Sequence, residues 1–206
     1  MQVLKRASSL TRFPWVYRLW QTPFVEAKLE PLRRNQDLGK IRRVLDVGCG
    51  PGTNAPLFRE ADYLGLDLDP GYVDTARRRH GRDFIVADVR TYTAPEDERF
   101  DCILLNSLLH HIDDHGVDHI LRQLSRQLTP DGHIHILDLV LPSAPGLSRW
   151  LALSDRGDHP RPLTEWHHLF SAVFDEVIFE PYRVSLLGVP LWHMAYFKGT
   201  LKSVEP

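Results

Sequence analysis

The chain has 206 residues, 43% of them hydrophobic and 25% charged, a composition that excludes a disordered or fibrous protein. No apolar run approaches the roughly 18 residues of a membrane-spanning helix, and the N-terminus lacks the apolar core of a signal peptide. The two cysteines suit a reducing compartment better than a disulfide framework. We therefore expect a cytoplasmic protein without a membrane span.

The net charge of −2 conceals two unequal parts. Residues 1–43 carry ten Lys and Arg against three Asp and Glu, whereas residues 44–206 carry fifteen against twenty-four. Such a basic segment suits peripheral contact with an anionic surface such as a membrane, or docking on the body of the same chain. Residues 10–32 have a helical pattern dense in aromatic residues. We therefore predict a helical N-terminal arm or lid over residues 1–40 and one domain over residues 41–206.

Short apolar runs alternate with helical patterns from residue 41 onward. The runs are IRRVLDVG, DYLGLDL, DFIVAD, FDCILLN and GHIHILDLVLP, rich in Val, Ile and Leu like strands that are covered on both faces. Helices are predicted at 53–60, 70–80, 114–128 and about 164–172. This alternation predicts a doubly wound α/β sheet with right-handed crossovers. Two closing runs, VFDEVIFEPY and PLWHMAYFKG, predict a hairpin at one edge.

A glycine-rich turn follows the first predicted strand, in the sequence VLDVGCGPG. Glycines allow the backbone to bend sharply and to approach a ligand without a Cβ in the way. The helix that follows would present free amide groups to a carboxylate or phosphate. The same pattern also fits a dinucleotide site, or a tight turn without a ligand.

Acidic residues stand near the ends of three successive predicted strands, at Asp46, Asp67 and Asp88. The end of the second strand is where the ribose of a bound ligand would lie, and the carboxylate of Asp67 can accept both ribose hydroxyls. Asp88 can accept the exocyclic amine of an adenine. Asp69 is a rival of Asp67, but a proline follows it, so we predict that Asp69 caps a helix or forms a turn.

These segments together resemble the class I S-adenosylmethionine-dependent methyltransferases, and within them the group that includes the ubiquinone and menaquinone biosynthesis enzymes. The resemblance is carried by VLDVGCGPG, LGLDL, VADV, FDCILLNSLLHHID and LTPDGHIHILD, and it covers roughly residues 41–140. It implies S-adenosylmethionine as the cofactor. It also implies a seven-stranded, mostly parallel, Rossmann-like sheet whose last strand is antiparallel.

The resemblance also implies roles for individual positions. Asp46 and the glycine turn would hold the methionine part, Asp67 the ribose, Asp88 and Val89 the adenine, and the carbonyl of Asn106 would lie near the methionine ammonium. The implied cofactor-binding residues are Asp46, Gly48, Cys49, Gly50, Gly52, Asp67, Leu68, Asp88, Val89 and Asn106. In the N-terminal arm, Tyr17 is either a further cofactor contact, as part of a lid with Trp20, or an ordinary packing residue.

Candidate catalytic residues follow the fourth predicted strand. His110 and His111 would lie on the rim where α/β ligands bind, where a neutral imidazole can take a proton from a hydroxyl acceptor. The alternative is that one of the pair only packs beneath the cofactor. Asp158, His159 and Arg161 belong to a charged loop after the fifth strand. We predict that this loop contacts the acceptor, although such loops are often merely solvated.

No metal site is predicted among the eleven histidines. His115 and His119 fall on the solvent face of the helix at 114–128, opposite its apolar stripe. His133 and His135 alternate along the fifth strand and are expected to be half-buried strand residues.

The predicted function is transfer of a methyl group from S-adenosylmethionine to a small-molecule or lipid-like acceptor. Members that methylate nucleobase amines carry an N/D-P-P-Y/F box where this chain has Asn106-Ser107-Leu108-Leu109, so no nucleic-acid partner is expected. An oxygen acceptor is favoured, because a histidine pair is available as a base. Two alternatives stay open. One is an NAD-dependent oxidoreductase, against which stand Thr53 at the third fingerprint position and the lack of a Tyr-x-x-x-Lys pair. The other is a non-catalytic binding or scaffold protein.

Overall fold

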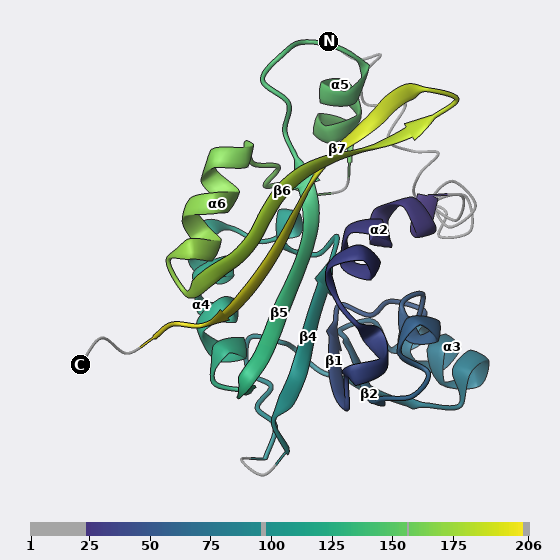
Figure 1. The fold of residues 1–206 in the computed structure, drawn as a ribbon. Helices are drawn as coiled ribbons and strands as arrows, with labels where there is room; N and C mark the ends of the chain where they lie inside the picture. The colour runs from purple at the N-terminus through teal and green to yellow at the C-terminus, as the bar shows by residue number, and fades with distance from the viewer. Residues whose placement is uncertain (1–23, 96–97, 156, 204–206) are drawn as a thin grey trace.

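The centre of the molecule is a seven-stranded sheet in the order β3-β2-β1-β4-β5-β7-β6 (Figure 1). This computed structural model describes residues 24–95, 98–155 and 157–203. The strands are β1 (Arg43–Val47), β2 (Asp62–Asp67), β3 (Asp83–Val86), β4 (Phe100–Asn106), β5 (Leu128–Val140), β6 (Phe174–Leu186) and β7 (Val189–Leu201). Strands β1 to β5 pair in parallel, and β7 runs antiparallel to both of its neighbours. The predicted fold class and the predicted C-terminal hairpin are confirmed.

The helices connect the strands and cover both faces of the sheet. They are α2 (Val25–Asn35), α3 (Pro70–His80), α4 (Asp114–Ser125), α5 (Leu147–Ser154) and α6 (Leu163–Ser171), with the 3-10 helices η3 (Leu38–Lys40), η4 (Ala55–Phe58) and η6 (Leu109–His111). The predicted helix at 70–80 is confirmed, and the one near 164–172 corresponds to α6.

Two predicted helices differ from the observed ones. The segment 53–60 contains only η4, where bonds to the third residue back, such as Leu57 N to Asn54 O at 3.0 Å, close a tighter turn. The segment 114–128 is helical only to Ser125. Leu128 instead pairs with Phe100 as the first residue of β5. The last residue of the predicted helix is therefore part of the sheet.

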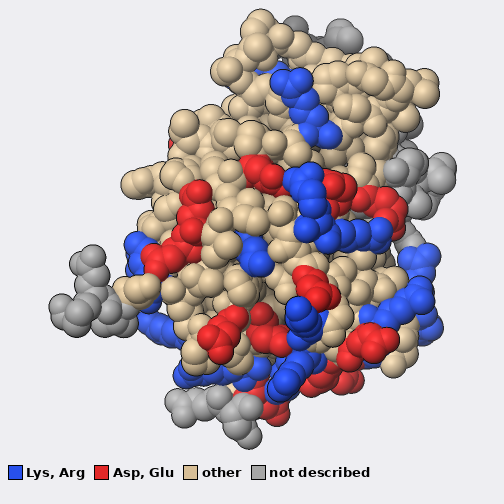
Figure 2. All heavy atoms as spheres, viewed as in Figure 1, with Lys and Arg blue, Asp and Glu red and all other residues tan. Residues whose placement is uncertain are grey.

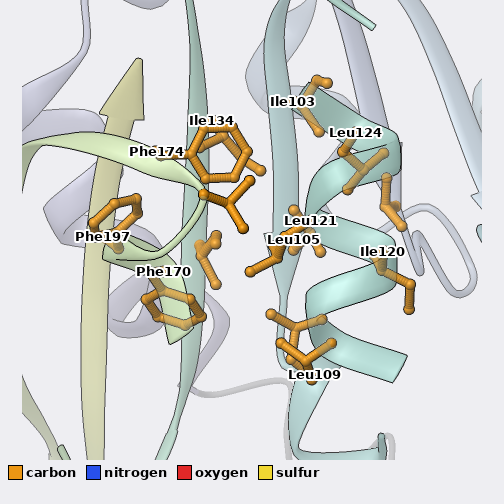
Figure 3. Packing of buried hydrophobic residues seen from close by; sticks show 14 of the residues in the cluster. Ile103, Leu105, Leu109, Ile120, Leu121, Leu124, Ile134, Phe170, Phe174 and Phe197 are labelled. Atoms are coloured by element: carbon orange, nitrogen blue, oxygen red, sulfur yellow. The ribbon is translucent and has the colours of Figure 1, made fainter. Parts of the chain in front are cut away.

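One face of the sheet is covered by α4 and α6 (Figure 1). The strand residues on this face alternate with those on the other, as side chains of a pleated strand must. In β4, for example, Ile103 and Leu105 face α4, where the apolar stripe includes Ile120 and Leu124 (Figure 3). Phe170 of α6 joins the same core. Asp113 caps α4 by accepting a bond from the Gly116 amide at 2.8 Å, in agreement with the predicted start of that helix.

The opposite face of the sheet is covered by α2 and α3. Leu29 and Leu32 of α2 pack with Val44, Cys102 and Leu104 of the central strands. Helix α2 therefore shares the core of the sheet. The predicted division into an arm over residues 1–40 and a domain over residues 41–206 stays a prediction, since most of the arm lies outside the described residues. Among the described residues, no helix has both the length and the apolar character needed to cross a membrane.

The hairpin of β6 and β7 extends beyond the rest of the sheet, and α5 lies beside its tip (Figure 1). Ala152 of α5, Phe24 and Trp192 of β7 belong to one buried apolar cluster. The rings of Phe24 and Trp192 meet edge to face, with centroids 4.8 Å apart. The beginning of the described chain is therefore fixed against this end of the molecule.

The fifth strand also carries a histidine that makes stability depend on pH. His135 is fully buried, more so than the half-buried position expected, and its Nδ1 lies 3.0 Å from the Tyr196 hydroxyl. Burial, helped by the charges of Lys198 and His133, lowers its pKa from 6.5 to about 3. Below pH 6.5 His135 is protonated in the unfolded chain but stays neutral in the folded chain. The free energy of unfolding therefore decreases as the pH falls from 6.5 toward 3.

We expect His135 to lower the free energy of unfolding by about 2 kcal/mol at pH 5, relative to neutral pH. His135→Leu should remove that part of the acid sensitivity, whereas the same change at the exposed His115 of α4 should not. Denaturant unfolding of the three proteins at neutral and acidic pH measures the difference. Equal pH slopes for wild type and His135→Leu would contradict the assignment.

Candidate cofactor and active site

The glycine turn after β1 has the backbone geometry that its sequence predicts. Gly48, Gly50 and Gly52 have φ values of 70°, 54° and 79°, in the left-handed region that side chains disfavour. The amides of Gly48 and Cys49 both donate to the carbonyl of Leu66 at the end of β2, at 2.8 and 2.9 Å. A Cβ added at Gly50 would meet no atom within 4 Å. The turn is therefore held from below while open space lies beside Gly50.

Asp67 connects this turn to the end of β2. Its Oδ2 accepts the Gly50 amide at 2.8 Å, and its Oδ1 accepts the Asp69 amide at 2.9 Å. Asp69 itself caps α3, accepting the amides of Gly71 and Tyr72 at 2.7 and 3.2 Å. The helix-capping role predicted for Asp69 is confirmed, and Asp67 is the carboxylate that faces the turn.

A pocket of about 570 Å³ opens at the carboxyl ends of β1, β2 and β3. Seven of the predicted site residues line it: Gly48, Asp67, Leu68, Asp88, Val89, His111 and His159. Its apolar wall includes Val47, Leu66 and Ile120. A largely apolar cavity with a few polar groups at its rim is the common form of a small-ligand site.

Asp88 lies in this pocket but already has a partner. The guanidinium and the backbone amide of Arg90 both donate hydrogen bonds to the Asp88 carboxylate, with Nε 2.9 Å from Oδ2. These bonds hold the pKa of Asp88 below its usual value. Contact of Asp88 with an adenine amine stays a prediction. It requires that a carboxylate oxygen of Asp88 accept a further hydrogen bond in addition to those from Arg90.

The side chain of Asp46 lies away from the pocket. It is fully buried on the α2 and α3 side of the sheet, the same side as Val44, because alternate residues of β1 face opposite ways. Asn54 donates to both of its oxygens, at 3.1 and 3.2 Å, and Tyr63 donates to Oδ2 at 2.5 Å. Burial outweighs these bonds and raises the pKa of Asp46 to about 6. In this structure Asp46 supports the turn from behind, and its contact with the methionine part, through the ammonium or an ordered water, stays a prediction.

Asn106 and Ser107 extend this buried polar chain toward the N-terminal helix. Asn106 donates to the side-chain oxygen of Asn54 at 3.1 Å and accepts from Ser107 at 3.2 Å. Lys28 of α2 reaches the Ser107 hydroxyl at 3.4 Å. The predicted role of the Asn106 carbonyl stays a prediction, since these bonds involve its side chain only.

Cys49 and Gly52 also lie outside the pocket lining. Cys49 is buried under the turn, and burial raises the pKa of its thiol. A Cβ at Gly52 would stand 2.6 Å from the His80 ring, so glycine is needed there for close packing against α3. Both residues shape the turn rather than the cavity. Tyr17 lies outside the described residues.

His110 is the buried member of the histidine pair. Its Nδ1 lies 2.5 Å from Oδ1 of Asp138, a fully buried residue of β5, and its Nε2 lies 3.9 Å from Oδ2 of Asp155. Burial alone would lower the pKa of His110. The carboxylates of Asp138 and Asp155 outweigh burial, so the pKa lies above its usual 6.5. The centroid of the His111 ring lies 4.2 Å from that of His110, with the two rings tilted by 38°, and His111 lines the pocket.

The loop after α5 closes over His110. A Cβ at Gly157 would stand 2.2 Å from Cδ2 of His110, and the His159 amide donates to the His110 carbonyl at 3.0 Å. His110 Nε2 is consequently buried, without a hydrogen-bond partner among the described residues. Such an orphaned ring nitrogen beside a pocket is a candidate site for a reacting proton.

The three residues predicted to contact the acceptor have different surroundings. Asp158 is exposed, and His159 is exposed at the pocket rim. Arg161 is buried: its guanidinium donates to Asp114 at 2.7 Å and to the Ile112 carbonyl at 2.6 Å, and it stacks on Trp166. These contacts fix the loop to α4 and α6, so we leave Arg161 out of the acceptor site proposed below.

Sequence patterns did not predict the roles of Asp138, Lys28 and the Asn54–Tyr63 pair. Asp138 had a visible signal, because it is the single charged residue in the apolar run HIHILDLVLP and a charge inside a doubly covered strand needs a partner. Lys28 and Tyr63 come from segments distant in the chain, and no local pattern marks them.

Comparison with known proteins identifies the fold family. Residues 44–132 match the family described as a methyltransferase domain. This match supports a class I S-adenosylmethionine-dependent methyltransferase. This assignment favours a methyltransferase over the NAD-dependent oxidoreductase that the glycine turn also allowed.

Two relatives are similar over a little less than half of the chain. The trans-aconitate 2-methyltransferase of Methylobacterium nodulans is 40% identical over 97 residues, which is 44% of this chain and 35% of that protein. The fatty-acid O-methyltransferase of Mycolicibacterium smegmatis is 36% identical over 104 residues, which is 47% of this chain and 37% of that protein. The match thus spans little more than a third of each relative.

The human N-acetylserotonin methyltransferase, solved in complex with SAM, has the same fold. It superposes with a TM-score of 0.68 at 19% identity, over 95% of this chain and 59% of that chain.

The residues present fit S-adenosylmethionine. The cavity is large enough for a nucleoside, Gly48 and the Asp67 carboxylate line it, and open space lies beside Gly50, where an added Cβ would meet no atom within 4 Å. Gly48, Gly50, Asp67, Leu68 and Val89 are the residues that would hold the molecule.

We expect Asp67→Ala to weaken binding of S-adenosylmethionine and of its demethylated product by about 2–4 kcal/mol, through loss of charge-assisted hydrogen bonds. Asp69→Ala is the matched control. It should lose about 1 kcal/mol of folding stability with the α3 cap and keep its affinity. Calorimetric titration and thermal unfolding of both variants separate the two effects. Unchanged affinity in Asp67→Ala, or an equal loss in Asp69→Ala, would refute the role given to Asp67.

Proposed function

We propose that this chain transfers a methyl group to an oxygen of a small or lipid-like acceptor, with His110 as the base and Asp138 as its positioning partner. The observation that carries the proposal is the buried His110–Asp138 pair at 2.5 Å, next to His111, which lines the pocket. S-adenosylmethionine, when bound, would supply the methyl group from its sulfonium. The protein's own work is then to align the acceptor, exclude water and accept a proton.

The proton transfer follows from the contacts of the imidazole. Asp138 also accepts the Leu109 amide at 2.7 Å and the Leu139 amide at 2.7 Å, so its carboxylate stays ionised and fixed. It therefore holds the hydrogen of His110 on Nδ1, which leaves Nε2 as the basic atom. When a hydroxyl acceptor is methylated, its proton would move to Nε2, and Asp138 would stabilise the resulting imidazolium. The bond to Asp138 is the reason we propose His110 rather than His111 as the base, although His111 is the member of the pair that lines the pocket.

The acceptor would approach through the loop after α5. His110 Nε2 faces Asp155 beneath this loop, so the loop must move when the acceptor binds. Asp158 and His159, exposed on the loop, are the residues we propose for acceptor contacts. Carboxylic-acid acceptors, suggested by relatives named for trans-aconitate and fatty acids, need no base, whereas hydroxyl acceptors do.

Three further proposals complete the account. Residues 1–40 act as an arm or lid whose basic charge favours peripheral contact with a membrane, the protein resides in the cytoplasm, and no nucleic acid takes part. A non-catalytic protein that only binds the cofactor is the alternative, and it is excluded by transfer of labelled methyl to any acceptor in a panel of hydroxyl and carboxyl compounds.

The pH dependence of kcat/KM tests the base. Because only neutral His110 can take a proton and its pKa lies above 6.5, the rate should fall as the pH drops through that raised pKa. Asp138→Asn removes the carboxylate that raises the pKa, so its midpoint should move to lower pH. His110→Asn should lose about 10²–10⁴ in turnover while keeping its affinity for S-adenosylmethionine.

A rate that is flat from about pH 5 to 8 would leave alignment alone as the mechanism and point to an acceptor that is already ionised. A large loss in His111→Asn with little loss in His110→Asn would assign the base to the neighbouring imidazole. An unshifted midpoint in Asp138→Asn would remove Asp138 from the mechanism.

A further inference from the structure

Exposed apolar side chains gather at one end of the molecule. Of the nine large hydrophobic residues that are exposed in the described part of the chain, six lie on α5 or at the β6–β7 turn: Leu147, Trp150, Leu153, Leu186, Leu187 and Val189. We call these six the apical patch. Leu187, at the tip of the turn, is 96% exposed. Exposed apolar residues that gather at one end of a molecule mark a contact surface, whereas single exposed apolar residues are ordinary.

The apical patch is one fixed surface. The three residues of α5 recur every third position and so share one side of the helix. Ser148 donates to the Pro190 carbonyl at 2.8 Å, which ties α5 to β7, and Ala152 is buried against the strand below. Figure 1 shows α5 beside the tip of the hairpin. The patch therefore projects as a rigid apolar end rather than as a loose loop.

The charges at this end are basic. Among the described residues of 139–154 and 181–197, the only Lys, Arg, Asp or Glu residues are Arg149 and Arg183. In Figure 2 the upper end of the molecule, where Figure 1 places α5 and the hairpin tip, is mostly tan with blue and no visible red. Phe24, the first described residue, lies in the cluster beneath the patch, and residues 1–23 of the sequence carry four Lys and Arg and no acidic residue.

The apical patch also adjoins the active site. Helix α5 ends at Ser154 and leads directly into the loop that covers His110, whose first residue is Asp155. Leu153 is thus two residues from the carboxylate that faces Nε2. A surface that bound here would lie next to the segment that must move to admit an acceptor.

We propose that the apical patch docks on an anionic lipid bilayer. Exposed Leu and Trp side chains with arginines beside them match the apolar and charged layers of a bilayer surface. The docked chain would face the bilayer with the loop over His110, so that an acceptor dissolved in the lipid reaches the site without crossing water. The docking itself does not depend on the proposed methyl transfer.

The test is flotation of the full chain with phosphatidylcholine vesicles, with and without phosphatidylglycerol. Wild type should float with the anionic vesicles, and less so at about 1 M salt, where charges are screened. Leu187→Glu and Leu153→Glu should each reduce the bound fraction about tenfold, because a carboxylate would enter the apolar layer. Val177→Glu is the matched control. Val177 is 48% exposed near the opposite end of β6, and its variant should float like wild type.

Three outcomes would overturn the proposal. They are failure of wild type to float, equal losses in the control and patch variants, and binding that depends only on the basic residues of 1–23 when these are changed to Gln. Sedimentation velocity supplies a second readout. A wild-type dimer that Leu187→Glu dissociates, without vesicle binding, would assign the patch to a second copy of this chain. Affinity for S-adenosylmethionine should be equal in all variants, which keeps a failure of docking distinct from a failure of the proposed function.

Discussion

Parallel pairing of β1 to β5 is the constraint on which the rest of this molecule depends. It brings the carboxyl ends of the strands to one edge, so that residues far apart in the chain meet there. At that edge the Asp67 carboxylate bonds the amides of Gly50 and Asp69, which locks the glycine turn to the start of α3. The pocket is the space that remains above this locked turn.

The same constraint separates two kinds of acidic residue. Side chains alternate along each strand, so an acid inside a strand, such as Asp46, is buried in the core, whereas Asp67 at a strand end faces the ligand edge. Asp46 is held by Asn54 and Tyr63 and supports the turn from behind. Asp138, also inside a strand, meets a histidine instead and thereby gains a chemical role. Burial thus produces a support in one strand and a charge pair in another.

Sequence patterns predicted the fold and the position of the pocket well, because both depend on local features. Strand periodicity, the glycine turn and the strand-end position of Asp67 can each be recognised within a few residues. The motif position of Asp46 did not show that the pleat buries its side chain behind the turn. The roles of Asp138 and Arg161 depend on contacts between elements that are distant in the chain. Asp138 of β5 contacts His110 of η6, and Arg161 contacts both α4 and α6. Such pairings follow from the packed structure and from no local spacing.

Calorimetric titration tests the central claim, that S-adenosylmethionine binds against the glycine turn at Gly50. Gly50 and Gly81 share a positive φ, at 54° and 59°, and open space around an added Cβ, but only Gly50 lies at the ligand edge. Alanine at either position should therefore lower the free energy of unfolding by about 1–2 kcal/mol, the usual cost of placing one non-glycine residue in the left-handed region. We expect wild type and Gly81→Ala to bind S-adenosylmethionine and its demethylated product but not NAD, and Gly50→Ala to lose about tenfold or more in affinity. Tight binding of NAD by wild type, or equal affinities in the two alanine variants, would contradict the account.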